Sequence, residues 1–262
     1  MNAPVRYVVD RAVATITLDR PDAMNSLDTD TKVALRDHVR RAADDLAVRA
    51  VVLTGTGRAF CVGQDLNEHA HGLAKGVADL GQTVREHYSP IATTLATMPK
   101  PVVAAVNGIA AGAGAAFAFA CDLRIVADTA GFNLAFASIG LSCDSGSSWT
   151  LPRLVGWARA RELLLLPRTV EADEALALGL ATEVVPAGAV VERATELARQ
   201  LAAGPTQAYA AIREVLDYSA THSLAESVVN EAVLMGRTGA TEDHRGAVTS
   251  FLAKQPPTFE GR

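Results

Sequence analysis

Cysteine, aromatic residues and basic charge are all scarce in this chain of 262 residues. The three cysteines, Cys61, Cys121 and Cys143, lie far apart, which excludes a disulfide framework and a zinc ribbon. They predict reduced thiols and a cytoplasmic protein. The net charge of −5 gives no support for nucleic-acid binding, so an anionic ligand would need a local basic patch.

Long hydrophobic runs are also missing. The longest apolar run, from Ile109 to Cys121, is too short and too rich in alanine and glycine to span a bilayer. The first ten residues lack the apolar core of a signal peptide. We therefore expect a soluble protein that does not associate with membranes.

Glycine turns are what the sequence does contain, and the most informative one lies in A-V-N-G-I-A-A-G-A-G-A-A-F-A-F-A-C-D, residues 105–122. An apolar strand comes before it and a helix of small residues follows, so the turn exposes backbone N–H groups that attract negative charge. The spacing of Gly108, Gly112 and Gly114 matches neither a dinucleotide fingerprint nor a Walker A loop. The alternative is that the small residues only let helix and sheet pack closely.

The order of the predicted elements changes near Gly204. Before it strands alternate with helices, and after it the pattern is helical only. We predict an α/β core over residues 1–204 and, over residues 205–262, a helical region that either covers part of the core or serves in oligomerisation by binding another subunit. The predicted segments are strands at 7–9, 12–18, 50–53, 100–106, 123–126 and 181–185, an extended edge at 132–136, a flap at 69–81, and helices at 28–43, 82–97, 158–166, 172–178, 190–203, 207–216, 224–235 and 242–252.

A second glycine turn, F-C-V-G-Q-D-L at residues 60–66, makes the pattern specific. Together the two turns resemble the enoyl-CoA hydratase/isomerase (crotonase) superfamily, and the resemblance extends through A-C-D-L-R-I-V-A and L-P-R-L-V-G to F-L-A-K near the C-terminus. It implies a crotonase-like spiral of repeated ββα units with a C-terminal helical trimerisation region. It also implies homotrimers or hexamers and an acyl-CoA thioester substrate, with no metal and no cofactor besides the coenzyme A of the substrate.

The resemblance assigns an oxyanion hole to the backbone N–H groups of Gln64 and Ala113. The family usually has glycine at the second position, but alanine keeps the N–H. Two preorganised donors stabilise the negative charge that develops on a thioester carbonyl oxygen, and the helix that begins near Ala113 adds its dipole.

The glutamates with which hydratases of this family handle water are missing, because Ala116 and Phe136 stand at their positions. Asp144, in I-G-L-S-C-D-S-G-S-S-W, is the remaining candidate. It resembles the proton-moving aspartate of ring-1,2-epoxyphenylacetyl-CoA and dienoyl-CoA isomerases. It also resembles the nucleophile of 4-chlorobenzoyl-CoA dehalogenases. The alternative is that Asp144 caps the helix that begins near Ser145.

We therefore predict an enzyme that isomerises an enoyl-CoA, at a double bond or an epoxide ring, with one aspartate as acid and base. An enoyl-CoA hydratase, a dehalogenase-like enzyme with a nucleophilic aspartate and a non-catalytic acyl-CoA binder remain alternatives. The substrate-binding and CoA-binding residues that we predict are Arg58, Gln64, Asp65, Leu66, Asn67, Ala113, Phe136 and Lys254.

Some of these residues have a second interpretation. Arg58 and Lys254 stand where relatives contact the CoA phosphates, Lys254 from a neighbouring subunit, but each could equally be a solvated surface charge. Asp65 resembles a motif aspartate that supports the turn. Trp149 is expected in the core.

Overall fold

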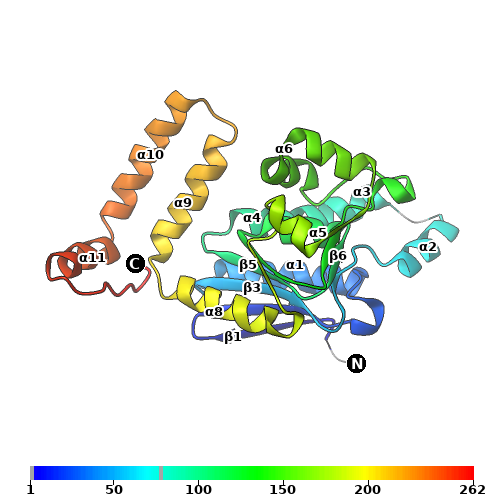
Figure 1. The fold of residues 1–262 in the computed structure, drawn as a ribbon, viewed down its shortest axis with the longest axis horizontal. Coiled ribbons are helices and arrows are strands. Elements are labelled where there is room, and N and C mark those ends of the chain that lie inside the picture. The colour runs from blue at the N-terminus through cyan, green and yellow to red at the C-terminus, as the bar shows by residue number, and fades with distance from the viewer. Residues whose placement is uncertain (1–2, 77–78) are drawn as a thin grey trace.

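The computed structural model describes residues 3–76 and 79–262, which form two sheets surrounded by helices (Figure 1). The larger sheet is six-stranded, and all its neighbours are parallel except the first pair, β1 and β2. Its strands in spatial order are β1 (Val5–Asp10), β2 (Val13–Leu18), β3 (Ala50–Gly55), β5 (Val102–Val106), β7 (Leu123–Ala127) and β10 (Glu183–Val185). Strands β3 and β5 are buried along their whole length, as expected for parallel strands covered on both faces.

The smaller sheet gives the fold its repeat. Its strands are β4 (Ala59–Cys61), β6 (Ile109–Ala111), β8 (Gly131–Asn133) and β9 (Thr169–Glu171), with only the last pair antiparallel. β4, β6 and β8 each come next in the chain after β3, β5 and β7 of the larger sheet, and each precedes a helix. The predicted α/β spiral of ββα units is confirmed.

Helices cover the two faces of the larger sheet. α8 (Val190–Ala202) lies against β3, β5 and β7 through alanines spaced four residues apart, and Figure 1 shows it along one face. α1 (Thr29–Asp44) and α4 (Ser89–Thr97) pack on the other side. The side chain of Asp28 accepts a hydrogen bond from the Thr31 N–H, so the predicted N-cap of α1 is confirmed.

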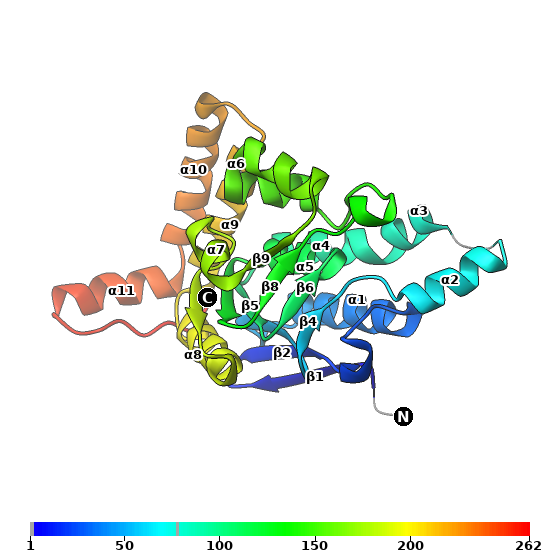
Figure 2. The ribbon, with the colours of Figure 1, turned by 45° about the vertical axis from the view of Figure 1, so that its right-hand side comes forward.

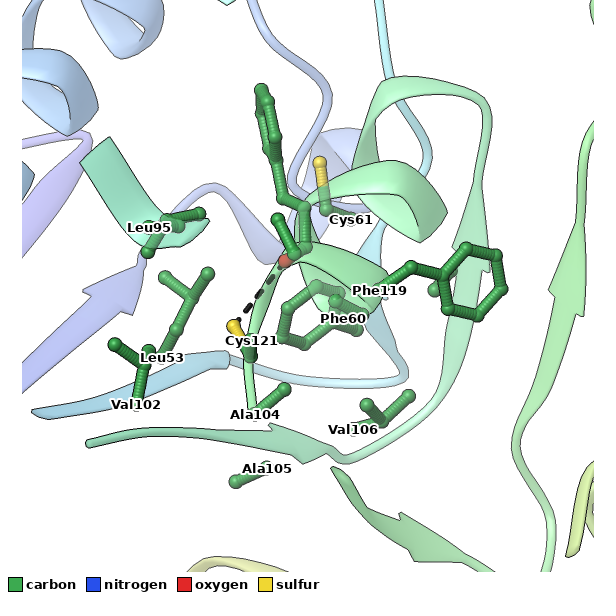
Figure 3. Close-up of a cluster of buried hydrophobic side chains, with 14 of the residues drawn as sticks. Leu53, Phe60, Cys61, Leu95, Val102, Ala104, Ala105, Val106, Phe119 and Cys121 are labelled. Carbon is green, nitrogen blue, oxygen red and sulfur yellow. Dashed lines mark hydrogen bonds between the residues drawn. The ribbon is translucent and has the colours of Figure 1, made fainter. Parts of the chain in front are cut away.

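The two glycine turns pack against each other in the core between the sheets. α5 (Ala113–Ala120) is buried on every side, and Figure 3 shows side chains of β3, β5 and α5 meeting there. A Cβ on Gly114 would lie 2.1 Å from the carbonyl oxygen of Cys61, so α5 can approach β4 this closely only with glycine. Burial raises the pKa of the Cys61 and Cys121 thiols to about 12, which keeps both protonated and inert.

The segment before α4 corrects one prediction. Residues 69–74 belong to α2 (Leu66–Ala74), so the flap predicted there is wrong for that part, and residues 77–78 of the flap lie outside the described residues. α3 (Leu80–Thr83) and a π-helical turn (Val84–Tyr88) then continue without a break into α4. The helix predicted over 82–97 is confirmed.

The chain after β8 differs from the predicted extended edge. β8 ends at Asn133, and Phe136 already has helical backbone angles before a 3-10 turn, Ala137–Ile139. α6 (Ser147–Leu165) follows, with a kink at Gly156. β9 was not predicted, whereas α7 (Ala172–Ala177) was.

The chain beyond Gly204 is helical, as predicted, and projects from the core (Figure 2). It contains α9 (Thr206–Ser219), α10 (Leu224–Gly239) and α11 (Glu242–Leu252). Arg213 of α9 pairs with Asp122 and donates to the carbonyl oxygens of Leu95 and Ala96. Arg49 donates to the hydroxyl of Thr206 at 2.8 Å. Within the described residues no helix is both long and apolar enough to cross a membrane.

Candidate active site

The two glycine turns meet at a cavity of about 390 Å³. Residues from both turns and from the loop before α6 line it together, although they are far apart in the sequence. The predicted site residues on its wall are Gln64, Asp65, Leu66, Asn67, Ala113, Phe136 and Asp144.

The first turn depends on Gly63. Its φ of +81° lies in the left-handed region, where a side chain is strained. A Cβ there would lie 3.0 Å from the carbonyl oxygen of Ala111 and 3.3 Å from the backbone nitrogen of Ala113. The backbones of the two turns are therefore in contact, which brings Gln64 next to Ala113.

The second turn depends on Gly112, whose φ of +51° and ψ of −124° suit glycine. Ala113 is the first residue of α5, and it is not among the residues with positive φ, so its methyl group is accommodated without backbone strain. The N–H of such a first helical residue has no acceptor within its own helix.

The backbone N–H groups of Gln64 and Ala113 share one property. Neither donates to a protein acceptor in residues 3–76 and 79–262. Both residues line the cavity, and α5 contributes the positive end of its dipole. This arrangement can hold an oxygen that becomes negatively charged.

Asp144 lies on the same wall, in the loop before α6. Burial raises the pKa of its carboxyl group, and a hydrogen bond from the Ser145 hydroxyl partly opposes the rise. The residue at the N-cap of α6 is Gly146, and no side chain caps this helix. The alternative in which Asp144 serves as a helix cap is therefore wrong.

Asp65 is the other carboxylate on the cavity wall, and both its oxygens are occupied. Oδ1 accepts hydrogen bonds from the backbone N–H groups of Asn67 and Glu68, and Oδ2 accepts from Arg20 and Ser26. Burial raises the pKa of Asp65, but these hydrogen bonds outweigh it and hold the pKa below its usual value. Asp65 supports the first turn, which leaves Asp144 available for chemistry.

The two positions of the missing glutamates differ in their surroundings. Ala116 is fully buried within α5, whereas Phe136 lines the cavity. Neither side chain can transfer a proton. The rest of the wall is largely apolar, with Val62, Leu80 and Leu141 among its residues.

Sequence reasoning did not assign a role to Tyr88 or Lys32. Tyr88 lines the cavity, and its hydroxyl donates to Oε1 of Gln64 at 2.5 Å. The ammonium group of Lys32 is buried and lies 3.4 Å from the same oxygen and 3.3 Å from Glu68. Burial raises the pKa of the Tyr88 hydroxyl, so it stays protonated and remains a donor. Its neighbour His87 lies outside this cavity.

Two predicted binding residues, Arg58 and Lys254, do not line the cavity, and one core prediction, for Trp149, also fails. Arg58 is exposed beside the first turn and is not on the wall. Lys254 follows α11, which both views place at the opposite end of the molecule from α2 (Figures 1 and 2). Trp149 is 38% exposed and stacks against Arg153, so its predicted place in the core is wrong.

A spiral of two sheets, with two backbone donors and a carboxylate lining one cavity, is an arrangement suited to an α/β enzyme that stabilises an oxyanion. The particular family follows from sequence comparison: the model of the enoyl-CoA hydratase/isomerase family matches residues 9–262. The chain belongs to this family, whose chemistry acts on acyl-CoA thioesters.

Individual relatives span several activities. A "probable enoyl-CoA hydratase" of Rhodobacter capsulatus is 42% identical over 98% of both chains. The 1,2-epoxyphenylacetyl-CoA isomerase of Escherichia coli is 38% identical over 97% of both chains. A protein from Mycobacterium abscessus, assigned as an enoyl-CoA hydratase/isomerase, has a crystal structure that matches with a TM-score of 0.95 at 44% identity, over 98% of this chain and 100% of that one.

Proposed function

We propose that this protein is an acyl-CoA isomerase that works through an enolate held in an oxyanion hole. The N–H groups of Gln64 and Ala113 bind the thioester carbonyl oxygen. Asp144 removes a proton from the α-carbon of a 3-enoyl-CoA, and the electron pair moves into the enolate. The same carboxyl group then returns the proton at the γ-carbon, which leaves the double bond between the α- and β-carbons.

One observation carries this proposal: Asp144 is a carboxylate with no ion pair among the described residues, and it lines the same cavity as two backbone N–H groups that have no acceptor there. Burial raises its pKa toward the range in which a general base works well near neutral pH. Ala116 and Phe136 give no second acid or base for the addition of water.

The expected substrate is an unsaturated or ring-derived acyl-CoA. A volume of about 390 Å³ is within the usual size of a small-molecule site. Phe136 and Tyr88 bring aromatic faces to the wall, which suits a flat acyl group. The Escherichia coli relative, at 38% identity, is named for a substrate that contains a ring.

The test compares two substrates with purified protein. We expect conversion of 3-enoyl-CoA thioesters to 2-enoyl-CoA, and incorporation of deuterium when the reaction runs in D2O. Efficient hydration of crotonyl-CoA without any movement of a double bond would instead identify a hydratase, the activity named for the Rhodobacter relative.

A second candidate is nucleophilic attack by Asp144 on an aryl-CoA. It is favoured by a 4-chlorobenzoyl coenzyme A dehalogenase of an Arthrobacter species, which is 36% identical over 84% of this chain and 79% of its own length. The aspartyl ester that this mechanism requires would place 18O from labelled water in Asp144 over repeated turnovers. Tight acyl-CoA binding with no turnover over a broad thioester panel would instead identify the protein as a non-catalytic acyl-CoA binder.

The assembly and the location are also proposals. Large apolar side chains are exposed on all three C-terminal helices, and we propose that they pack against other copies in a homotrimer or hexamer. Lys254 would then reach the CoA phosphates of a neighbouring subunit, while Arg58 would contact the CoA bound to its own chain. The three free thiols suit a cytoplasmic protein.

A further inference from the structure

Ser145 adopts an unusual backbone conformation directly after Asp144. Its φ is +53°, and Gly146 follows with φ +81° and ψ 4°. The carbonyl oxygen of Asp144 accepts a hydrogen bond from the Ser147 N–H at 2.9 Å, which closes a four-residue turn. Positive φ at both central residues is typical of a type I′ turn, where glycine, asparagine and aspartate are preferred. Serine at the first central position is therefore strained.

The side chain of Ser145 gives a reason for the strain. Only 2% of the residue is exposed, and its Oγ donates a hydrogen bond to Oδ1 of Asp144 at 2.7 Å. Glycine would form the same turn without strain but could not donate this bond. Non-glycine residues in strained conformations are found preferentially at functional sites.

We propose that Ser145 is a positioning residue that holds Oδ1 of Asp144, so that Oδ2 is the oxygen that takes and returns the proton. This inference rests on the proposed function, because it assumes that Asp144 is the acid and base. Positioning matters because proton transfer needs the base within hydrogen-bond reach of the reacting carbon's proton, and small misplacements cost large factors in rate.

The same hydrogen bond favours the charged form of Asp144. Burial raises the pKa of Asp144 and the bond from Ser145 lowers it, so loss of the hydroxyl raises the pKa further. Of the other titratable groups near this carboxyl, Tyr88 and Cys143 have raised pKa values and stay neutral. Asp65, which lines the same cavity, is held by Arg20, and His69 of α2 lines this cavity as well.

Two substitutions separate the hydrogen bond from the strain. Ser145→Ala removes the hydroxyl and keeps a Cβ at positive φ, whereas Ser145→Gly removes both. Ser147→Ala is the matched control, because the Ser147 hydroxyl is also buried but has no hydrogen-bond partner in the described part of the chain. All four proteins are assayed with trans-3-hexenoyl-CoA from pH 5 to 9.

We expect both Ser145 variants to lower kcat by roughly tenfold. The acid limb of their kcat/KM profiles should move up by about half a pH unit to one unit, because the base loses a hydrogen bond to its charged form. Ser145→Gly should be the more stable of the two, and Ser147→Ala should keep the wild-type profile. An unchanged acid limb in Ser145→Gly would overturn the proposal, as would an equal shift in Ser147→Ala.

A second measurement does not depend on turnover. The carbonyl stretch of the protonated Asp144 carboxyl, identified by its loss in Asp144→Asn, is titrated by infrared difference spectroscopy. We expect its midpoint to rise in both Ser145 variants, and an unchanged midpoint contradicts the inference. Asp144→Asn distinguishes failure of this inference from failure of the proposed function. If Asp144→Asn is inactive but the Ser145 variants titrate and turn over as wild type, only this inference fails. If Asp144→Asn turns over as wild type, the proposed function is rejected.

Discussion

The hydroxyl of Tyr88 donates a 2.5 Å hydrogen bond to Oε1 of Gln64, and the ammonium group of Lys32 lies 3.4 Å from the same oxygen. The side chain of Gln64 is thus tied to α1 and to the π-helical turn before α4. Its backbone N–H has no protein partner among the described residues. The side chain of Gln64 therefore makes structural contacts, whereas its backbone N–H remains available to bind an oxygen.

Substitutions at Gln64 and Tyr88 should distinguish the role of the Gln64 side chain from that of its backbone N–H. Gln64→Ala keeps the backbone N–H, so we expect kcat/KM to fall by less than about tenfold, well below the loss of two to three orders of magnitude seen when an oxyanion donor itself is removed. Tyr88→Phe removes one hydrogen bond and should lower the free energy of unfolding by about 1 kcal/mol. Steady-state kinetics and urea unfolding measure both effects. A hundredfold loss in Gln64→Ala would show that the side chain itself takes part.

Asp144→Asn should lower kcat by roughly a hundredfold or more while acyl-CoA binding stays near normal, because the substitution removes the proposed base and keeps its size. Stability should not fall, since the Asp144 side chain caps no helix. The raised pKa means that the folded state binds more protons than the unfolded state above about pH 4. Wild-type stability therefore falls as pH rises through that window, and the variant should lack this contribution. Thermal unfolding from pH 3 to 8 compares the two, and wild-type turnover would contradict the catalytic role.

Gly63→Ala should disturb the proposed oxyanion site directly. The new Cβ would meet the Ala111 carbonyl oxygen and the Ala113 nitrogen, at a backbone conformation that itself costs a side chain about 1–2 kcal/mol. We expect this loss of stability together with a fall in kcat of roughly a hundredfold. Gly156→Ala is the control, because Gly156 has a similar φ of +75° with nothing within 4 Å of the added Cβ. Equal activity of the two variants would argue against the assigned hole.

Arg213→Ala tests how the C-terminal helices are attached. The Arg213 side chain is 10% exposed, and its loss leaves Asp122 without its cation, which should cost about 3 kcal/mol in the free energy of unfolding. The exposed pair of Arg237 and Glu214 provides the control, and Arg237→Ala should cost less than about 1 kcal/mol. Chemical denaturation of both variants measures the loss in the free energy of unfolding. Equally small losses in both would show that Arg213 makes only a surface contact and does not attach α9 to the core.

Val233→Glu tests the proposed assembly. Val233 of α10 is 64% exposed, and Phe251 of α11 is 80% exposed. A charge placed at such an apolar contact is left desolvated, so we expect the variant to dissociate while its core stays folded. Light scattering coupled to size-exclusion chromatography measures the mass. A wild-type protein that is monomeric at micromolar concentration would contradict the proposal.

The sequence by itself determined the two glycine turns and the start of α1, whereas the spiral was predicted from the resemblance to the crotonase superfamily. Asp28 begins its helix as predicted, and Gly63, Gly112 and Gly114 stand where the backbone needs positive φ or close approach. These features are local, because a cap, a turn or a glycine acts within a few residues of chain. The sequence also shows directly that apolar residues, Ala116 and Phe136, occupy the two positions at which hydratases of the family have glutamates.

Tertiary structure decided what no local pattern contains. The three-residue strands β6 and β9 are too short to show a period, so only their neighbours in the small sheet define them. The sequence places Tyr88 on a predicted helix, but only the folded chain brings its hydroxyl to Oε1 of Gln64. From the sequence, a helix cap was an alternative role for Asp144, and only the turn at Ser145 and Gly146, which places Gly146 at the N-cap of α6, excludes it. These contacts depend on which segments, distant in the sequence, come within hydrogen-bond distance of one another. Only the packing of the whole chain determines this.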